Sequence, residues 1–193
     1  MKKFELTNEF ITNMFGTKLF RIRALVEFGD VEAGELGGYV EKESNLGHDD
    51  NAWVYDNAWV YGNARVYGDA QVSGDARVYD NARVYGNAWV YGNAWVYGNA
   101  WVYGDALVCS DEDYAYAHGF GSVNRTTTFF RLKDGGVGVR CGCFYGTLAQ
   151  FRDKIRETHG ETKKAQEYLM LADLMELRFE EDENEVGNRK YVE

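Results

Sequence analysis

Histidine is the residue type in this sequence that is best suited to general acid–base chemistry, because its side chain titrates near neutral pH. The chain has three histidines, His48, His118 and His159. We expect His48, in the segment GHDD, and His118, in the segment AYAHGFGS, to lie in loops that could reach a groove. His159 precedes Gly160 at an expected helix end, where the helix dipole favours a cation. His48 and His118 are therefore the candidate catalytic bases.

The cysteines are the second set of residues that could carry chemistry. Cys141 and Cys143 lie two apart in an expected strand, which would place both thiols on one face. Metal sites usually have two residues between the cysteines of a pair and a second pair elsewhere. We favour buried thiols that pack as small apolar groups, and we predict no metal and no cofactor. With Cys109 the count is three, and this odd number favours a reduced, cytoplasmic setting.

A six-residue repeat dominates the middle of the chain. Valine recurs every six residues from Val54 to Val108, and alanine lies two residues before each valine. Alanine and valine share one face of a short strand, and the following Gly-Asn or Gly-Asp favours a turn. Three such sides make a coil of 18 residues, and stacked coils pair as parallel strands about 4.8 Å apart. The pattern predicts a β-solenoid with a narrow core of alanine and valine.

The frame extends backwards along the chain. Val40 and Leu46 are six residues apart, but the step from Leu46 to Val54 is eight, so two extra residues bulge out around 48–50. We expect about twelve inward positions and about four coils between 38 and 110.

The repeat resembles the hexapeptide-repeat left-handed β-helix proteins, through Val-Tyr-Gly-Asn-Ala-x over residues 51–109. With GELGGYVEKESNL, GCFYGTL and ETHG, nearly the whole chain looks like phage and prophage hexapeptide-repeat proteins of mostly unassigned role. The resemblance implies left-handed winding, against the usual right-handed crossover preference. It also implies trimers and, in many members, acyl transfer by a histidine base in a groove between subunits.

The residues on either side of each valine should point outward in rows 18 apart. We call this set the aromatic wall and predict that it forms a protein-binding or self-association surface, because Trp, Tyr and Arg are enriched at binding hot spots. Its members are Trp53, Trp59, Trp89, Trp95, Trp101, Tyr61, Tyr79, Tyr97, Tyr67, Tyr85, Tyr103, Arg65, Arg77 and Arg83. The alternative is that the rows are ladders that only stabilise the stacked strands. Five exposed tryptophans would form a large apolar patch on a monomer.

The corners of the prism offer a further alternative. Asp56, Asn57, Asp75 and Asn93 recur at one corner, where oxygen ligands could hold a cation. Turn chemistry explains the same residues more simply, because Asp, Asn and Gly all favour such corners.

The flanking segments are expected to form separate units. Residues 1–37 should supply a strand over Lys18–Phe28 and a Gly-rich segment that caps the solenoid. Residues 111–193 should form a hairpin (126–132 and 137–144), a helix that begins with a capping box at Thr147, and a second helix with a frayed acidic tail. The fold class is thus mainly β, a left-handed parallel β-helix with a β entry and a ββαα tail.

Charge and composition narrow the function. The net charge is −10, so direct binding of nucleic acid or of an anionic membrane is not expected. No apolar run approaches a membrane span, and the N-terminal sequence predicts no signal peptide. We predict a non-enzymatic, cytoplasmic scaffold, phage-encoded, that binds itself as a dimer or trimer and binds, and thereby inhibits, a host protein with a basic surface, such as a defence nuclease or effector. The alternatives are a small-molecule acyltransferase that uses His48 or His118 and a structural phage component.

Overall fold

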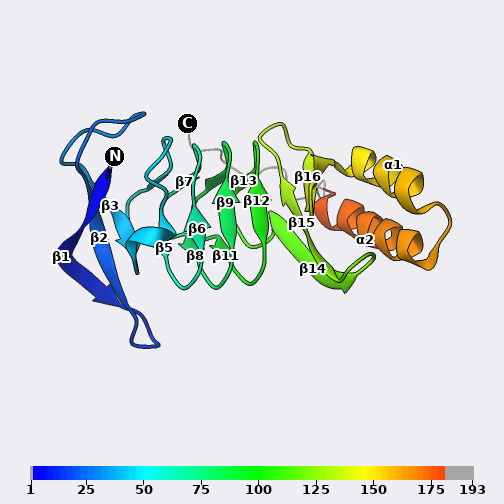
Figure 1. Cartoon of the computed structure of the whole chain (residues 1–193), viewed down its shortest axis with the longest axis horizontal. Helices are drawn as coiled ribbons and strands as arrows, with labels where there is room; N and C mark the ends of the chain where they lie inside the picture. Colours follow the sequence, from blue (N-terminus) through cyan, green and yellow to red (C-terminus); the bar gives the residue numbers. More distant parts are fainter. Residues whose placement is uncertain (1, 181–193) are drawn as a thin grey trace.

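The computed structural model of the protein describes residues 2–180 and is elongated (Figure 1). Antiparallel strands lie at the N-terminal end, a β-solenoid forms the middle, and a second antiparallel sheet with two helices lies at the other end (Figure 1). No helix in this part of the chain combines the length and apolar character that a membrane crossing requires.

The solenoid is built from very short parallel strands, each followed by a corner. These strands are β4 (Trp53–Val54), β5 (Trp59–Val60), β6 (Arg65–Val66), β7 (Gln71–Val72), β8 (Arg77–Val78), β9 (Arg83–Tyr85), β10 (Trp89–Val90), β11 (Trp95–Val96), β12 (Trp101–Tyr103) and β13 (Leu107–Val108). They stack 18 residues apart, so that Val54 pairs with Val72 and Val72 with Val90. The predicted β-solenoid of about four turns is confirmed, whereas its handedness stays a prediction.

The solenoid core has the predicted composition. Every alanine from Ala52 to Ala106 and every valine from Val54 to Val108 in the repeat has no exposed surface. The backward extension of the frame is also confirmed, because Val40 pairs with Val60 and Leu46 bridges Val66.

The corners take backbone conformations that glycine adopts without strain. At two corners aspartate replaces glycine, and Asp56 and Asp80 have φ of 52° and 59°. A Cβ atom on Gly86 would lie 2.9 Å from the backbone nitrogen of Gly104 in the next coil, so the coils approach too closely there for a larger residue. The carboxylate of Asp56 accepts the N–H of Gly74 at 3.0 Å. The corner side chains are thus engaged with the neighbouring coil.

The N-terminal segment contains two strands where one was expected. Strand β1 (Phe4–Thr12) pairs antiparallel with β2 (Lys18–Ala24), and β2 pairs with β3 (Leu36–Val40). The prediction missed β1 because glutamates interrupt its apolar pattern, which an edge strand tolerates. The predicted strand over Lys18–Phe28 also ends early, because the backbone of Ala24 bonds to Glu35 and Gly34 as the chain turns into β3.

This segment packs against the first coil of the solenoid. Phe4, Ile22 and Val31 are buried in the same cluster as the first coil. The Lys3 ammonium group donates to the backbone oxygens of Asp50 (3.0 Å) and Ala52 (2.8 Å) in the bulge, and burial lowers the pKa of Lys3 to about 8.

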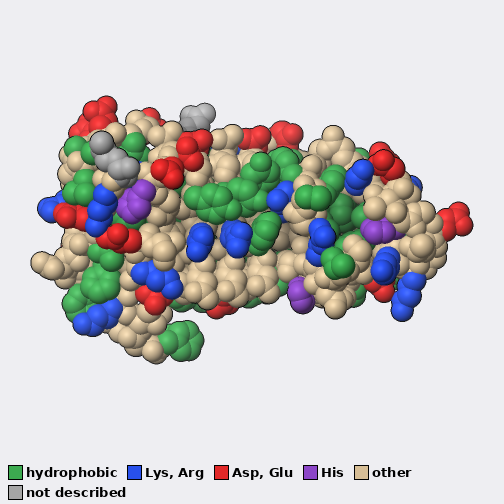
Figure 2. Space-filling view, in the orientation of Figure 1, with side chains coloured by type: hydrophobic (Ala, Val, Ile, Leu, Met, Phe, Trp, Pro, Cys, Tyr) green, Lys and Arg blue, Asp and Glu red, His purple; other side chains and the backbone are tan. Residues whose placement is uncertain are grey.

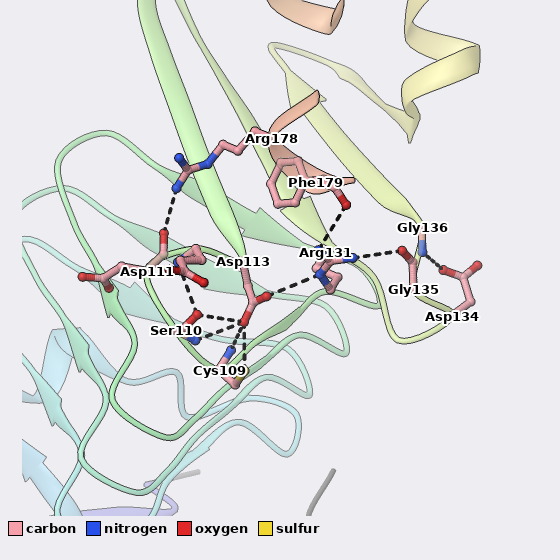
Figure 3. A network of polar contacts seen from close by, with 11 residues as sticks. Cys109, Ser110, Asp111, Asp113, Arg131, Asp134, Gly135, Gly136, Arg178 and Phe179 are labelled. Carbon is pink, nitrogen blue, oxygen red and sulfur yellow. Dashed lines mark hydrogen bonds and ion pairs between the residues drawn. The ribbon is translucent and has the colours of Figure 1, made fainter. Parts of the chain in front are cut away.

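A buried ion pair joins the last coil to the C-terminal unit (Figure 3). One oxygen of Asp113 accepts the backbone N–H groups of Cys109 (3.0 Å) and Ser110 (3.1 Å). The other oxygen faces Arg131 Nε at 3.4 Å, and Arg131 donates to the carbonyl oxygen of Phe179. The network therefore ties the solenoid exit, the second sheet and the last helix together.

The C-terminal unit has four strands where a hairpin was predicted. Its elements are β14 (Tyr114–Phe120), β15 (Arg125–Arg131), β16 (Val137–Cys141), β17 (Phe144–Thr147), α1 (Leu148–His159) and α2 (Lys163–Phe179). The predicted loop around His118 is strand β14, and the predicted second strand is broken because Gly142 turns with φ of 60°. The two helices and the Thr147–Gln150 capping box are confirmed. The acidic tail lies outside the described residues beyond Glu180.

The broken strand also separates the two thiols. Cys141 ends β16 and is half-buried, whereas Cys143 follows the turn and is exposed. The prediction that they share a strand face as buried apolar groups is wrong, because the left-handed turn at Gly142 redirects the chain.

Candidate protein-binding faces

The outward rows form as predicted, but they lie on three different faces of the prism. We call the outward side chains of β3, β5, β8 and β11 the long face, because these strands continue the sheet of β1 and β2. The arginine face is formed by β6, β9 and β12, and the mixed face by β4, β7, β10 and β13. Six members of the aromatic wall lie on the long face, namely Trp59, Arg77, Trp95, Tyr61, Tyr79 and Tyr97. Six lie on the arginine face, namely Arg65, Arg83, Trp101, Tyr67, Tyr85 and Tyr103.

The long face carries an alternating ladder of arginine and tryptophan. The guanidinium carbon of Arg77 lies 4.3 Å from the ring centre of Trp59 and 4.8 Å from that of Trp95. Beside it, Tyr79 stacks on Tyr61 at 5.1 Å and on Tyr97 at 5.3 Å. These contacts hold the aromatic side chains rigidly while leaving 41% of Trp95 and 38% of Tyr97 exposed.

The ladder continues onto the N-terminal strands. Tyr39 in β3 pairs with Trp59, and Arg21 in β2 lies over the Tyr39 ring at 5.1 Å. Ile11 of β1 and Tyr39 line a groove of about 460 Å³ together with Trp59 and Arg77. The long face is therefore a continuous surface from the hairpin to the last coil.

The arginine face differs in having two arginines side by side. Arg65 and Arg83 are register partners in β6 and β9, and both are exposed. The neighbouring tyrosines stack, with Tyr67 and Tyr85 4.8 Å apart. In Figure 2, basic and hydrophobic side chains lie in a band along the middle of the molecule, over β6, β9 and β12.

The C-terminal sheet closes one end of the arginine face. Arg140 of β16 lies 5.5 Å from the Trp101 ring and 5.4 Å from the Tyr103 ring, and Tyr145 packs edge-on against Tyr103 at 4.6 Å. The other end is open, where a groove of about 380 Å³ is lined by Arg65, Arg83, Tyr67, Ser44 and Gly47.

The mixed face corrects the prediction for Trp53. This side chain points away from the solenoid axis but is completely buried, because Phe28 packs edge-on to it at 5.3 Å and Phe4 at 6.2 Å. It therefore belongs to the N-terminal cap and not to a docking surface. Trp89, further along, is 43% exposed and has the Lys133 ammonium group 4.4 Å from its ring centre.

The prediction of five exposed tryptophans is thus wrong in detail. Trp53 is buried, Trp59 and Trp101 are half-buried, and only Trp89 and Trp95 are exposed. The flanking units and the interleaved arginines cover much of the indole surface.

The two faces also differ in the electrostatic environment of their tyrosines. Burial raises the pKa of Tyr79 on the long face to about 12, and its tyrosine neighbours and Asp80 add to the increase. Burial raises the pKa of Tyr67 and Tyr85 on the arginine face, but nearby guanidinium groups oppose the increase. On the long face Arg77 likewise opposes the increase at Tyr61, so the faces differ in number: three guanidinium groups, those of Arg65, Arg83 and Arg140, act on the pKa of Tyr67.

The candidate bases lie apart from each other. His48 stacks on Phe4 at 4.4 Å and accepts the backbone N–H of Lys3 through Nδ1, and burial lowers its pKa. His118 is exposed in β14 beyond the last coil, where its Nδ1 lies 3.0 Å from Thr126 Oγ1. Within one chain they occupy opposite ends of the solenoid.

Tyr39 and Arg140 are among the residues of the candidate faces that the sequence analysis missed. Tyr39 precedes Val40 in the extended frame, so its place in the ladder could have been predicted from the spacing. Arg140 has no such signal, because it reaches Trp101 only through the packing of the C-terminal sheet.

The comparison with protein families concerns the solenoid. No curated protein is significantly similar to the chain. The family model described as YdcK Beta solenoid repeat matches residues 58–74, 70–82, 76–92, 82–98 and 89–104. These segments lie within the coils that carry both faces. Over residues 58–104, the chain is therefore similar to the YdcK beta solenoid repeat.

Proposed function

We propose that this protein is a non-enzymatic scaffold that binds another protein through the long face. The observation that carries the proposal is the rigid ladder around Arg77, which holds the exposed Trp95 and Tyr97 in fixed positions. Preorganised Trp, Tyr and Arg side chains lose little conformational entropy on binding, and such residues supply most of the binding energy at hot spots.

The hairpin of β1 and β2 enlarges this surface. Its tip carries Met14 and Phe15, which are 88% and 81% exposed, and Ile11 lines the groove beside Trp59. A partner seated on the long face would contact both the ladder and the hairpin. Exposed apolar side chains beside a rigid aromatic surface favour a state in which a partner covers them over one in which they face water.

The partner has two candidate classes. One is a second or third copy of this chain, as the resemblance to hexapeptide-repeat proteins implies. The other is a host protein with a basic surface, such as a defence nuclease or effector, which a phage-encoded scaffold would inhibit in the host cytoplasm. The net charge of −10 supports a basic partner.

The acyltransferase alternative would require a groove between subunits. Because His48 and His118 lie at opposite ends of the solenoid, such a groove would use one of them, with other groups from a second copy. The partial burial of His48 against Phe4 does not favour proton exchange with a substrate. A structural role in the phage particle would use the same long face.

The experiment is a comparison of two matched double variants. Trp95→Ser/Tyr97→Ser removes exposed aromatic surface from the long face, and Met170→Ser/Leu174→Ser removes exposed apolar surface from α2. If the partner is a second copy, we expect the first variant to have a lower solution mass by light scattering than the wild type. If the partner is a host protein, we expect the first variant not to co-purify with it. The second variant should behave like the wild type in both measurements. Equal behaviour of the two variants would contradict the proposal.

A further inference from the structure

Two neighbouring cations on the arginine face lack a counter-charge. Arg65 and Arg83 are directly paired in adjacent parallel strands, and like charges opposite each other on a sheet destabilise it. Among residues 2–180, the arginines that form ion pairs are Arg23, Arg131, Arg152 and Arg156, and neither Arg65 nor Arg83 is one of them. What distinguishes Arg65 and Arg83 from other arginines without an ion pair is that they are register partners in adjacent strands.

Arg140 adds a third positive charge from the C-terminal sheet. It lies over Trp101 and Tyr103 at the closed end of the same face, and no carboxylate of the described chain pairs with it. The charges of Arg83, Arg140 and Arg65 all act on the phenol of Tyr67, against the effect of burial. Three guanidinium groups from two structural units therefore face one region.

The open end of this region is a groove because the preceding coil leaves it uncovered. The residue before Leu46 in the frame is Asn45, whose side chain turns inward and donates to the backbone oxygens of Ala64 (2.8 Å) and Gly62 (3.2 Å). It therefore does not cover Arg65. Carboxylates of the entry coil are engaged elsewhere, because Glu41 accepts the N–H of Gly62 and Glu43 pairs with Lys2.

We propose that the groove between Ser44 and Arg83 binds an acidic segment of a partner protein, whose carboxylates pair with Arg65 and Arg83. The guanidinium group matches a carboxylate with two parallel hydrogen bonds. A volume of about 380 Å³ accommodates one or two side chains, and Tyr67 offers an aromatic surface for their methylene groups. This inference rests on the proposed function, because it names a second contact of the same scaffold.

The charge around the groove favours a short acidic segment over a nucleic acid. Asp69 and Asp105 are exposed along one edge of the face and Asp80 along the other. A nucleic acid strand carries a phosphate at every nucleotide and would pass these carboxylates as it leaves the groove. A peptide with two or three adjacent glutamates can place its charges over the arginines alone.

The test uses a fluorescein-labelled hexaglutamate peptide and the full chain, with binding read by fluorescence anisotropy at low ionic strength. We expect the wild type to bind this peptide, and Arg65→Gln/Arg83→Gln to lose about tenfold or more in affinity. The charge-matched control Lys154→Gln/Arg156→Gln, on the exposed surface of α1, should bind like the wild type. A hexaglutamine peptide should not bind.

Two outcomes would overturn the inference. One is equal loss of binding in the arginine variant and the α1 control, which would show only nonspecific charge attraction. The other is tighter binding of a short oligothymidylate through the same arginines, which would make the face a nucleic acid site. Unchanged circular dichroism of the arginine variant excludes unfolding as the cause of any loss.

The same assay separates this inference from the proposed function. Trp95→Ser/Tyr97→Ser changes the long face only and should bind hexaglutamate normally. Loss of partner assembly in that variant with intact peptide binding supports both proposals. Absence of peptide binding in the wild type would reject the proposal that the groove binds an acidic segment. It would not affect the proposed docking on the long face, which the assembly measurement tests separately.

Discussion

The long face and the arginine face are built from the same six-residue repeat but place their arginines in different surroundings. On the long face, Arg77 lies between Trp59 and Trp95, so its charge interacts with two rings of the same chain. On the arginine face, Arg65 and Arg83 are neighbours without an intervening ring, and Arg83 has a ring on one side only, that of Trp101 at 4.8 Å. The backbone geometry is equivalent, because both faces pair in steps of 18 residues.

The difference shows that the variable residue before each valine decides what a face does. Where aromatic and cationic residues alternate, each cation interacts with rings of the same chain, and the resulting ladder stiffens the solenoid. Where two cations are adjacent, the row retains unneutralised charge and gains more from an external anion. Stability and binding can thus be distributed over different faces of one solenoid.

The largest expected effect is the loss of both rings around Arg77. Trp59→Ala/Trp95→Ala removes two cation–π contacts together with the half-buried ring of Trp59 and the more exposed ring of Trp95, and should lower the free energy of unfolding by about 2–4 kcal/mol. Urea denaturation followed by circular dichroism measures the change. A loss no greater than that of Met170→Ala/Leu174→Ala, which alters exposed residues of α2, would show that the ladder does not stabilise the solenoid.

High pH should lower the free energy of unfolding through the ionisation of Tyr79 on the long face. Burial raises the pKa of Tyr79 from 10.0 to about 12, so the unfolded chain releases this proton first. The contribution to stability is present below pH 10 and is lost as the pH rises towards 12. Tyr79→Phe should reduce this loss more than Tyr85→Phe does on the arginine face, as measured by chemical denaturation from pH 9 to 12. Equal effects would remove the electrostatic distinction between the faces.

Neutralising Arg77 should have a smaller effect. Arg77→Gln removes both cation–π contacts but keeps the two rings, and should cost about 0.5–2 kcal/mol. Arg77→Lys keeps the charge but loses the planar group that stacks on indole. The stability of this variant should therefore lie between that of the wild type and that of Arg77→Gln. Thermal unfolding of the three proteins tests this order, and a lysine variant as unstable as the glutamine variant would assign the effect to shape alone.

The smallest effect is expected on the arginine face. Arg65→Gln/Arg83→Gln relieves the repulsion between two adjacent like charges but also removes the contact of Arg83 with the Trp101 ring at 4.8 Å. Because these two effects oppose each other, the free energy of unfolding should change by less than about 0.5 kcal/mol. A marked loss of stability would show that these arginines belong to the fold, as Arg77 does. Measurement at low ionic strength makes any repulsion easiest to detect.

Much of the architecture could be predicted because the repeat is local and regular. The six-residue spacing of alanine and valine defines the inward face, and the 18-residue spacing predicts which outward residues meet, such as Trp59 with Arg77. The helices were also predictable, because the capping box at Thr147 and the apolar stripe with Phe151 and Ile155 are encoded within a few residues.

The prediction errors concern strands that form only by pairing with other segments of the chain. Strand β1 lacks a clear apolar alternation, since much of its surface is exposed and only pairing with β2 fixes its structure. Strand β14 was predicted as a loop because Gly119 and Gly121 lie close to His118, although Tyr114 and Tyr116 favour a strand, and pairing with β15 forms it.

The sequence by itself determined the solenoid and the order of side chains in each row, because a repeat with one period has one way to bury its alanines and valines. Only the tertiary structure decided which rows remain exposed to solvent. Packing of the N-terminal cap buries Trp53, and packing of the C-terminal sheet brings Arg140 to Trp101. These contacts join segments that share no periodic signal, so the exposed surface, and with it the candidate binding faces, emerges only when the end units pack on the coils.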